Sequence, residues 1–266
     1  MGKDKTIKRK ESKSYTDENV YKPAKRKRKS KRRGISLLRF LIVVTMGVGV
    51  YFLISSSLFD INEVSIMDNE YYTDRQISHL AGGIKGHNLF KADLTGMKER
   101  LKDDPYIKDV RISRKLPDKV IIRVQERREY AAIPYKEGYA IIDDEQMVLQ
   151  LASDGTGLTF IHDLEVLSAI AGENVKIKDE KALDEIINMM EAGDEKEIKF
   201  IRIEYSPITV KAYISDNLYC EGTAESIAGN IDALREILTD LHGKGIERGV
   251  IRINVGGHYS FSPNMK

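Results

Sequence analysis

The side chains that could carry catalysis lie at spacings that no common catalytic motif uses. Cys220 is the only cysteine, which excludes a disulfide within the chain and a Cys-based zinc site, and no base is identifiable for it. The chain contains no GxSxG or SxxK segment. The five histidines form neither HExxH nor another short metal-ligand spacing: His79, His87, His162, His242 and His258. We therefore expect no enzymatic activity, no metal and no cofactor.

Pairs of adjacent polar residues and glycines also do not form a recognisable catalytic or phosphate-binding site. Neighbouring side chains on a strand point to opposite faces, so His162 and Asp163 cannot act on one substrate atom. Acidic pairs at Asp103 and Asp143 are typical of solvated turns, whereas general acid and base catalysis needs two groups across a cleft. The Gly-Gly pairs at Gly82 and Gly256 lack a phosphate-loop pattern and indicate turns.

The formal net charge of +2 is an average over two opposite parts of the chain. Residues 1–33 contain 15 Lys and Arg against 4 Asp and Glu, and Arg39 brings this region to +12. The chain from residue 40 on carries −10, and no charge falls between Phe40 and Phe59. A helix of 20 uncharged residues spans roughly 30 Å, the thickness of a bilayer hydrocarbon core. This pattern disfavours a soluble single-domain protein.

The apolar run is either a cleaved signal peptide or a retained transmembrane helix. It is longer than a signal h-region, and Leu58 and Phe59 continue it past the small residues 55–57. A retained helix over residues 37–59 is therefore favoured. The residues expected to anchor it in the membrane are Phe40, Leu41, Ile42, Val43, Val44, Val50, Phe52, Leu53 and Ile54.

The basic run Lys22–Arg33 directly precedes this helix. By the positive-inside rule, the N-terminus is expected in the cytoplasm and residues 60–266 outside the cell membrane. Residues 1–36 lack hydrophobic periodicity and are expected to form a disordered basic tail that also contacts anionic lipid. No aromatic residue interrupts Lys25–Arg33, so we expect no nucleic-acid partner.

Residues 60–128 are expected to form a first outer domain in the order strand, helix, helix, strand, strand. Thr73 and Gln76 have the spacing of a capping box at the start of the first helix, and Pro105 ends the second. Alternating apolar residues from Tyr106 to Lys115 and from Lys119 to Glu126 predict the last two strands.

This segment resembles the POTRA domain of the FtsQ/DivIB family of bacterial cell-division proteins. The family often has Trp where Tyr106 stands, which keeps an aromatic residue. The family's order of basic tail, spanning helix and POTRA domain is also the order expected in this chain. The matching positions are Asn88, Leu89, Phe90, Asp93, Leu101, Pro105, Tyr106, Ile107, Val110, Arg114, Leu116, Pro117, Val124, Gln125, Glu126 and Arg127.

Residues 129–255 are expected to form a second, mixed β-domain, followed by a tail at 256–266, so the whole chain is of the α+β class. A hairpin is predicted within Gly138–Gln150 and a helix over Asp179–Met190. One helix over 225–245, the longest outside the membrane, precedes a last strand that begins at Gly249.

The resemblance implies a non-enzymatic scaffold of the division septum. Its partners would be FtsL-type and DivIC/FtsB-type bitopic proteins, and it would act on septal wall synthases indirectly. In the family the partner surface lies towards the C-terminal end of the β-domain. The resemblance therefore implies that this surface contains Val250, Ile251, Ile253, Tyr259 and Phe261. Arg114 of the POTRA motif is a further candidate partner-binding residue.

Other interpretations of these residues and of the protein's function stay open. Val250 and Ile253 alternate as core residues would, and Arg114 is also expected to pair with a local carboxylate. A POTRA protein for polypeptide transport or chaperoning is an alternative, although neither POTRA repeats nor barrel strands are seen. A membrane-anchored wall enzyme is disfavoured by the missing catalytic motifs.

Overall fold

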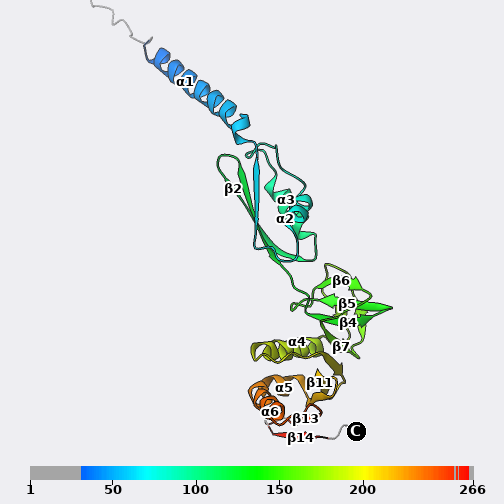
Figure 1. Cartoon of the computed structure of the whole chain (residues 1–266). Coiled ribbons are helices and arrows are strands. Elements are labelled where there is room, and N and C mark those ends of the chain that lie inside the picture. The colour runs from blue at the N-terminus through cyan, green and yellow to red at the C-terminus, as the bar shows by residue number, and fades with distance from the viewer. Residues whose placement is uncertain (1–30, 255, 257, 264–266) are drawn as a thin grey trace, which may run out of the picture. The chain divides into compact units, whose positions relative to one another are not determined.

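A computed structural model describes residues 31–254, 256 and 258–263 of the chain. It separates into two compact units, residues 1–54 and 55–266. The predicted disorder of the basic tail falls mainly on residues 1–30, which lie outside the described residues. The predicted α+β class is confirmed (Figure 1).

The first unit contains one helix, α1, at Lys31–Ile54. Ser36–Ile54 is long and apolar enough to cross a membrane, and it is the one such helix among the described residues. The helix ends before the predicted limit at residue 59. Because the Ser56 hydroxyl accepts a hydrogen bond from the Leu58 backbone N–H, the chain forms a short 3-10 turn, η1, at Ser57–Phe59 instead.

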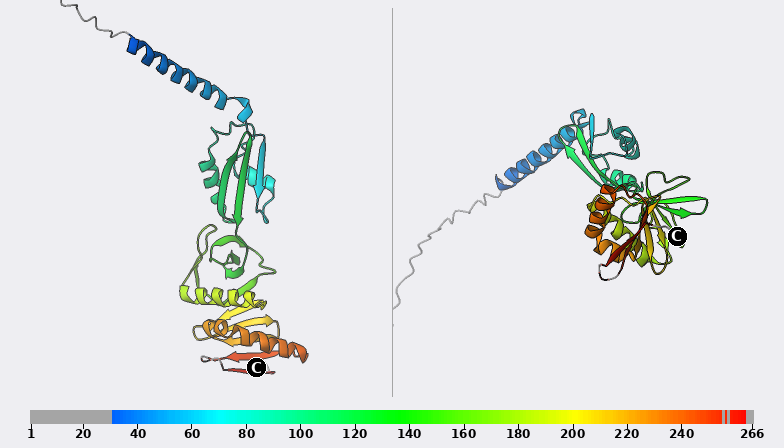
Figure 2. Two further views of the ribbon diagram at one scale, coloured as in Figure 1. Left: turned by 90° about the vertical axis from the view of Figure 1, so that its left-hand side faces the viewer. Right: turned by 60° about the horizontal axis from the view of Figure 1, so that its bottom comes forward.

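Residues 60–126 of the second unit contain a three-stranded sheet covered on one face by two helices (Figure 2). The sheet order is β1-β3-β2, with β1 parallel and β2 antiparallel to β3. The capping box at Thr73 and Gln76 is confirmed. The elements are β1 (Glu63–Met67), α2 (Asp74–Leu80), α3 (Leu94–Lys102), β2 (Ile107–Lys115) and β3 (Lys119–Glu126).

Apolar side chains between this sheet and its helices form a single core. Ile77, Met97 and Leu101 from the helices pack with Val120 and Ile122 from the central strand, and all five are fully buried. The helical i, i+4 spacing and the strand alternation both direct these residues to the same layer.

Within the described part of the chain, nine strands form the sheet of the second domain, in the order β14-β13-β12-β11-β10-β7-β4-β5-β6. A separate two-stranded ribbon pairs β8 with β9. The strands are β4 (Ala131–Tyr135), β5 (Gly138–Ile142), β6 (Val148–Ala152), β7 (Thr159–His162), β8 (Val166–Ser168), β9 (Lys176–Ile177), β10 (Arg202–Tyr205), β11 (Val210–Ser215), β12 (Leu218–Gly222), β13 (Gly249–Ile253) and β14 (Tyr259–Ser262).

Three helices pack on this sheet: α4 (Glu180–Glu195), α5 (Ala224–Gly229) and α6 (Ile231–Gly243). The prediction of one long helix over 225–245 is wrong, because the helix breaks at Asn230. The Asn230 side chain donates to the Ser226 carbonyl and thereby competes with the helical backbone bond. With 16 residues, α4 exceeds the 13 residues of α6.

Five strands of the second domain were not predicted: β8 and β9 of the separate ribbon, and β4, β12 and β14 of the main sheet. β4 contains Pro134, which has no backbone N–H to donate. Only Ala131 and Ala132 of β4 pair with β7, so Pro134 removes no hydrogen bond between these two strands. β12 follows β11 through the tight turn at Asp216-Asn217. β14 lies within the segment expected to be a tail, and its pairing with β13 is a contact between segments that no local pattern encodes.

Candidate partner-binding edge

The structure places the predicted partner residues in three different environments. Val250, Ile251 and Ile253 are buried, with at most 3% of each residue exposed, so the reading of these side chains as core fits their positions. Tyr259 on β14 is 57% exposed. Phe261, two residues on, is half-buried and packs against the main core of the domain.

Gly249 allows β14 to lie flat against β13. Its φ of +143° is in the region that favours glycine. A Cβ atom at this position would lie 2.5 Å from the Phe261 ring and 2.6 Å from the Ser262 carbonyl oxygen. The Phe261 ring therefore occupies space that only glycine leaves free, and this fixes the register in which Ile253 faces Tyr259.

β14 is an open edge of the sheet among the described residues, since only β13 pairs with it. The opposite edge, β6, is covered: Val148 donates to the Glu173 carbonyl and accepts from the Gly172 N–H. An uncovered strand presents unpaired backbone donors and acceptors to another chain. Tyr259 and Phe261 on this strand add aromatic surface and no charge.

The edge strands of the first domain are less suited to strand addition. β2 carries Lys108, Arg111, Arg114 and Lys115 along nine residues, and charged side chains on an edge strand discourage pairing. β1 begins with the charged residue Glu63 and carries no aromatic side chain. The edge at β14 is consequently the better candidate for contact with an extended partner segment (Figure 1).

A small aromatic cluster lies beside this edge and was missed by the sequence reasoning. Tyr213 and Tyr219 face each other across β11 and β12 with ring centroids 4.8 Å apart, and Val250 packs with them. The Arg202 guanidinium lies 3.9 Å from the Tyr213 ring centroid. The Asp216-Asn217 turn between two alternating segments was the available signal for this pairing.

Arg114 has a structural role in the first domain. Its Nε donates to the Leu89 carbonyl at 2.7 Å and its Nη2 to the Ala92 carbonyl at 3.0 Å. The expectation that Arg114 pairs with a local carboxylate is therefore wrong. The guanidinium instead satisfies backbone carbonyls of the segment before α3, which have no partner strand.

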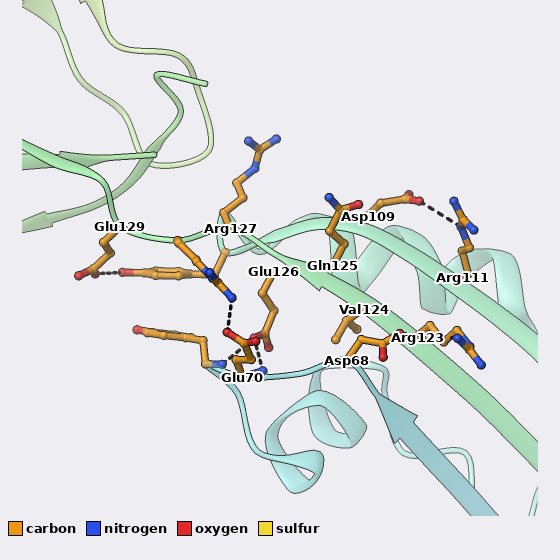
Figure 3. Close-up of a pocket in the computed structure, with 13 residues that line it drawn as sticks. Asp68, Glu70, Asp109, Arg111, Arg123, Val124, Gln125, Glu126, Arg127 and Glu129 are labelled. Atoms are coloured by element: carbon orange, nitrogen blue, oxygen red, sulfur yellow. Dashed lines mark hydrogen bonds and ion pairs between the residues drawn. The ribbon is translucent and has the colours of Figure 1, made fainter. Parts of the chain in front are cut away.

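A groove of about 770 Å³ lies beside the carboxyl end of β3 (Figure 3). Tyr71 stacks on Tyr106 at one side of it, with ring centroids 4.2 Å apart. The Glu126 carboxylate accepts the backbone N–H groups of Glu70, Tyr71 and Tyr72 at 2.6, 2.6 and 3.1 Å. Glu126 thus holds the loop that carries the tyrosines, a role that the motif ending at Arg127 did not reveal.

Two ionisable groups of the groove have shifted pKa values. A hydrogen bond from Lys102 lowers the pKa of Asp109 to about 2, so this carboxylate stays ionised. Burial, followed by the hydrogen bond to Glu129, raises the pKa of the Tyr106 hydroxyl above its usual range. Asp109 therefore acts as a fixed charge and Tyr106 as a hydrogen-bond donor near neutral pH.

Cys220 is fully buried in the β-domain. Burial raises the pKa of the Cys220 thiol to about 12, so it stays protonated. No group of three or more His, Cys, Asp or Glu residues among those described could hold a metal ion.

Comparisons with known proteins agree with this architecture. Residues 59–127 match the model of the FtsQ-type POTRA domain. The chain is 28% identical over 181 residues to the cell division protein DivIB of Clostridium acetobutylicum, covering 65% of this chain and 71% of that protein. It is 23% identical over 256 residues to DivIB of Clostridium botulinum, covering 94% and 98% of the two chains. It is 21% identical over 247 residues to DivIB of Bacillus subtilis, covering 91% and 88%.

The chain has the features of a membrane-anchored POTRA protein. These are an apolar N-terminal helix that can serve as a single-pass membrane anchor, a POTRA domain and a β-domain. Along most of its length the chain is similar to proteins of the FtsQ/DivIB family of bacterial cell division, and its residues 59–127 match the FtsQ-type POTRA domain. Its role is in cell division.

Proposed function

We propose that this chain is a non-enzymatic scaffold of the divisome that binds FtsL-type and DivIC/FtsB-type bitopic proteins outside the membrane. Through them it would regulate septal wall synthases indirectly. The division of the chain into tail (1–36), membrane helix (37–59), POTRA domain (60–128), β-domain (129–255) and C-terminal tail (256–266) is part of this proposal, except that β14 extends the β-domain sheet into the last segment.

The observation that carries the proposal is the open edge at β14. Backbone pairing along this edge would supply affinity, and Tyr259 and Phe261 would supply specificity. Anchoring every partner in one membrane raises their effective concentration, so a short interface of modest affinity is sufficient.

Photo-crosslinking in growing cells tests this proposal directly. A photoreactive phenylalanine analogue at Tyr259 should capture small bitopic division proteins. The matched control is the same analogue at Ile208, which is 80% exposed and lies in a turn of the same domain. We expect Tyr259→Ala to weaken partner binding about tenfold, a loss of about 1.4 kcal/mol that is typical of an interface tyrosine.

The outcomes separate the scaffold from its rivals. Capture of transiting polypeptides in place of bitopic proteins would favour a transport or chaperone role. Equal capture from positions 259 and 208 would remove the edge strand from the proposal. Normal cell length and septum placement after depletion of the chain would contradict a partner role in division.

A further inference from the structure

Three large apolar side chains are exposed at one end of the POTRA domain. Leu58 is 66% exposed, Phe90 40% and Leu116 63%. Leu116 sits in the turn between β2 and β3, where a polar residue is the usual choice. The core of the domain does not need these side chains, since it is complete without them.

Contacts between their neighbours gather the three residues at the same end. The Leu89 N–H donates to the Phe59 carbonyl at 2.7 Å, and the Phe59 and Phe90 rings lie 5.1 Å apart. Arg114, two residues before Leu116, bonds to the Leu89 carbonyl. The β2–β3 turn lies at the end of the domain where residues 57–62 enter it (Figure 1).

Basic residues adjoin two of these apolar side chains in the sequence. Lys91 follows Phe90, and Arg114 and Lys115 precede Leu116; all three are exposed, and neither lysine forms an ion pair with another described residue. The nearby carboxylate of Asp118 accepts a hydrogen bond from the Asn62 side chain, and Glu63 pairs with Lys119. Exposed apolar side chains next to unpaired lysines match the interface of a bilayer that contains anionic lipid.

The length of the chain makes a bilayer the natural occupant of this surface. Leu58 follows Ile54, the last residue of the apolar helix α1, by four residues. Four residues span at most about 14 Å when fully extended, about twice the roughly 5–7 Å that the headgroups add on each side of the hydrocarbon core. Whichever side of the membrane the domain occupies, Leu58 cannot move far from the lipid headgroups.

We propose that Leu58, Phe90 and Leu116, together with Lys91, Arg114 and Lys115, form a membrane-docking patch that seats the POTRA domain on anionic lipid. The patch adds a second point of attachment to the single helix. Docking at two points restricts how the domain can tilt and therefore the height above the membrane at which partners are bound. This inference rests on the exposed residues of the POTRA domain and is independent of the partner edge at β14.

Site-specific fluorescence on the full chain in vesicles tests the patch. The single native thiol, Cys220, is fully buried, so an introduced cysteine can be labelled selectively. Leu116→Cys carries an environment-sensitive dye, and Ile208→Cys is the matched exposed control in the β-domain. Vesicles contain phosphatidylcholine with about a third phosphatidylglycerol and a spin-labelled lipid as quencher.

We expect quenching at position 116 to exceed that at position 208 at least twofold, with a blue-shifted emission at 116. The double substitution Lys91→Glu and Lys115→Glu should bring quenching at 116 down towards the value at 208. Equal quenching at the two positions in the wild-type background would overturn the proposal, and would leave a protein partner as the occupant. Unchanged quenching in the charge-reversed protein would overturn the role of the basic residues.

Discussion

At the scale of single residues, Tyr106 links the POTRA domain to the first residue of the β-domain. Its hydroxyl donates to the Glu129 carboxylate at 2.6 Å, and its ring stacks on Tyr71. Only 6% of the residue is exposed. Burial, followed by the hydrogen bond to Glu129, disfavours the ionised phenolate, so the folded state keeps the proton.

This arrangement predicts a pH dependence. Because the folded-state pKa of Tyr106 is raised above the unfolded value of about 10, the stability from its hydroxyl is fully present below pH 10 and is lost as the pH rises further. Tyr106→Phe should lower the free energy of unfolding by roughly 1.5–3 kcal/mol at pH 8, the range for a hydrogen bond to a charged group. That difference should shrink by pH 11.

Urea unfolding of both full-length proteins in detergent at pH 8 and pH 11 measures the effect. Tyr72 and Tyr130, whose pKa values are also raised by burial, are present in both proteins and cancel in the comparison. Tyr259→Phe serves as the control at an exposed tyrosine. A difference between Tyr106→Phe and wild type that is the same at both pH values would contradict this account.

At the scale of elements, β14 depends on one glycine of its neighbour. The Phe261 ring and the Ser262 carbonyl occupy the space above Gly249. β14 is held by a single strand, so a small displacement at this point affects its whole length. The partner edge is therefore sensitive to a position that no partner would touch.

Gly249→Ala should detach or shift β14 and lower the free energy of unfolding by about 1–3 kcal/mol. The new Cβ would collide with Phe261, and the backbone at this position has a positive φ. Hydrogen exchange of the amides of residues 259–262 should become faster. Gly256→Ala is the matched control, since Gly256 also has a positive φ of +108° but no atom within 4 Å of a new Cβ. Similar exchange rates in the two variants would show that contact with Phe261 does not hold the strand.

At the scale of the whole molecule, charge and hydrophobicity are segregated along the chain. The +12 region ends at Arg39, where the uncharged run begins. Described lysines and arginines of the second unit mostly pair with carboxylates, such as Lys178 with Glu165 and Arg252 with Glu221. Net positive charge is confined to the N-terminal side of the apolar run, since the chain from residue 40 on carries −10.

Replacing the basic residues of Lys22–Arg33 by Gln and Ser should reduce the fraction of chains with an extracytoplasmic C-terminus several-fold, by the positive-inside rule. Alkaline phosphatase fused after Lys266 reports that fraction, because the enzyme is active only outside the cytoplasm. A control that exchanges each Lys for Arg and each Arg for Lys keeps the charge and should keep the orientation. Full phosphatase activity in the neutralised variant would contradict the orientation argument.

The sequence by itself determined the features that depend on neighbouring residues. The apolar run of α1, the capping box at Thr73, the helices α3 and α4 and the strands β2 and β3 all arise from local spacing. The POTRA motif could also be recognised, because its residues lie within one continuous segment. These elements are encoded by periodicity and capping, which a single sequence displays.

Only the tertiary structure decided which candidate residues are accessible. The sequence favoured Tyr259 over Ile253 as a partner residue, but the accessibility of each depends on the sheet: Ile253 is buried and Tyr259 exposed because, among the described residues, β13 has neighbours on both sides and β14 on one. Arg114 donates to backbone carbonyls 22 and 25 residues away, which no local pattern in the sequence indicates. Strand order and long-range contacts are set by how complete cores pack, and no local pattern carries that information.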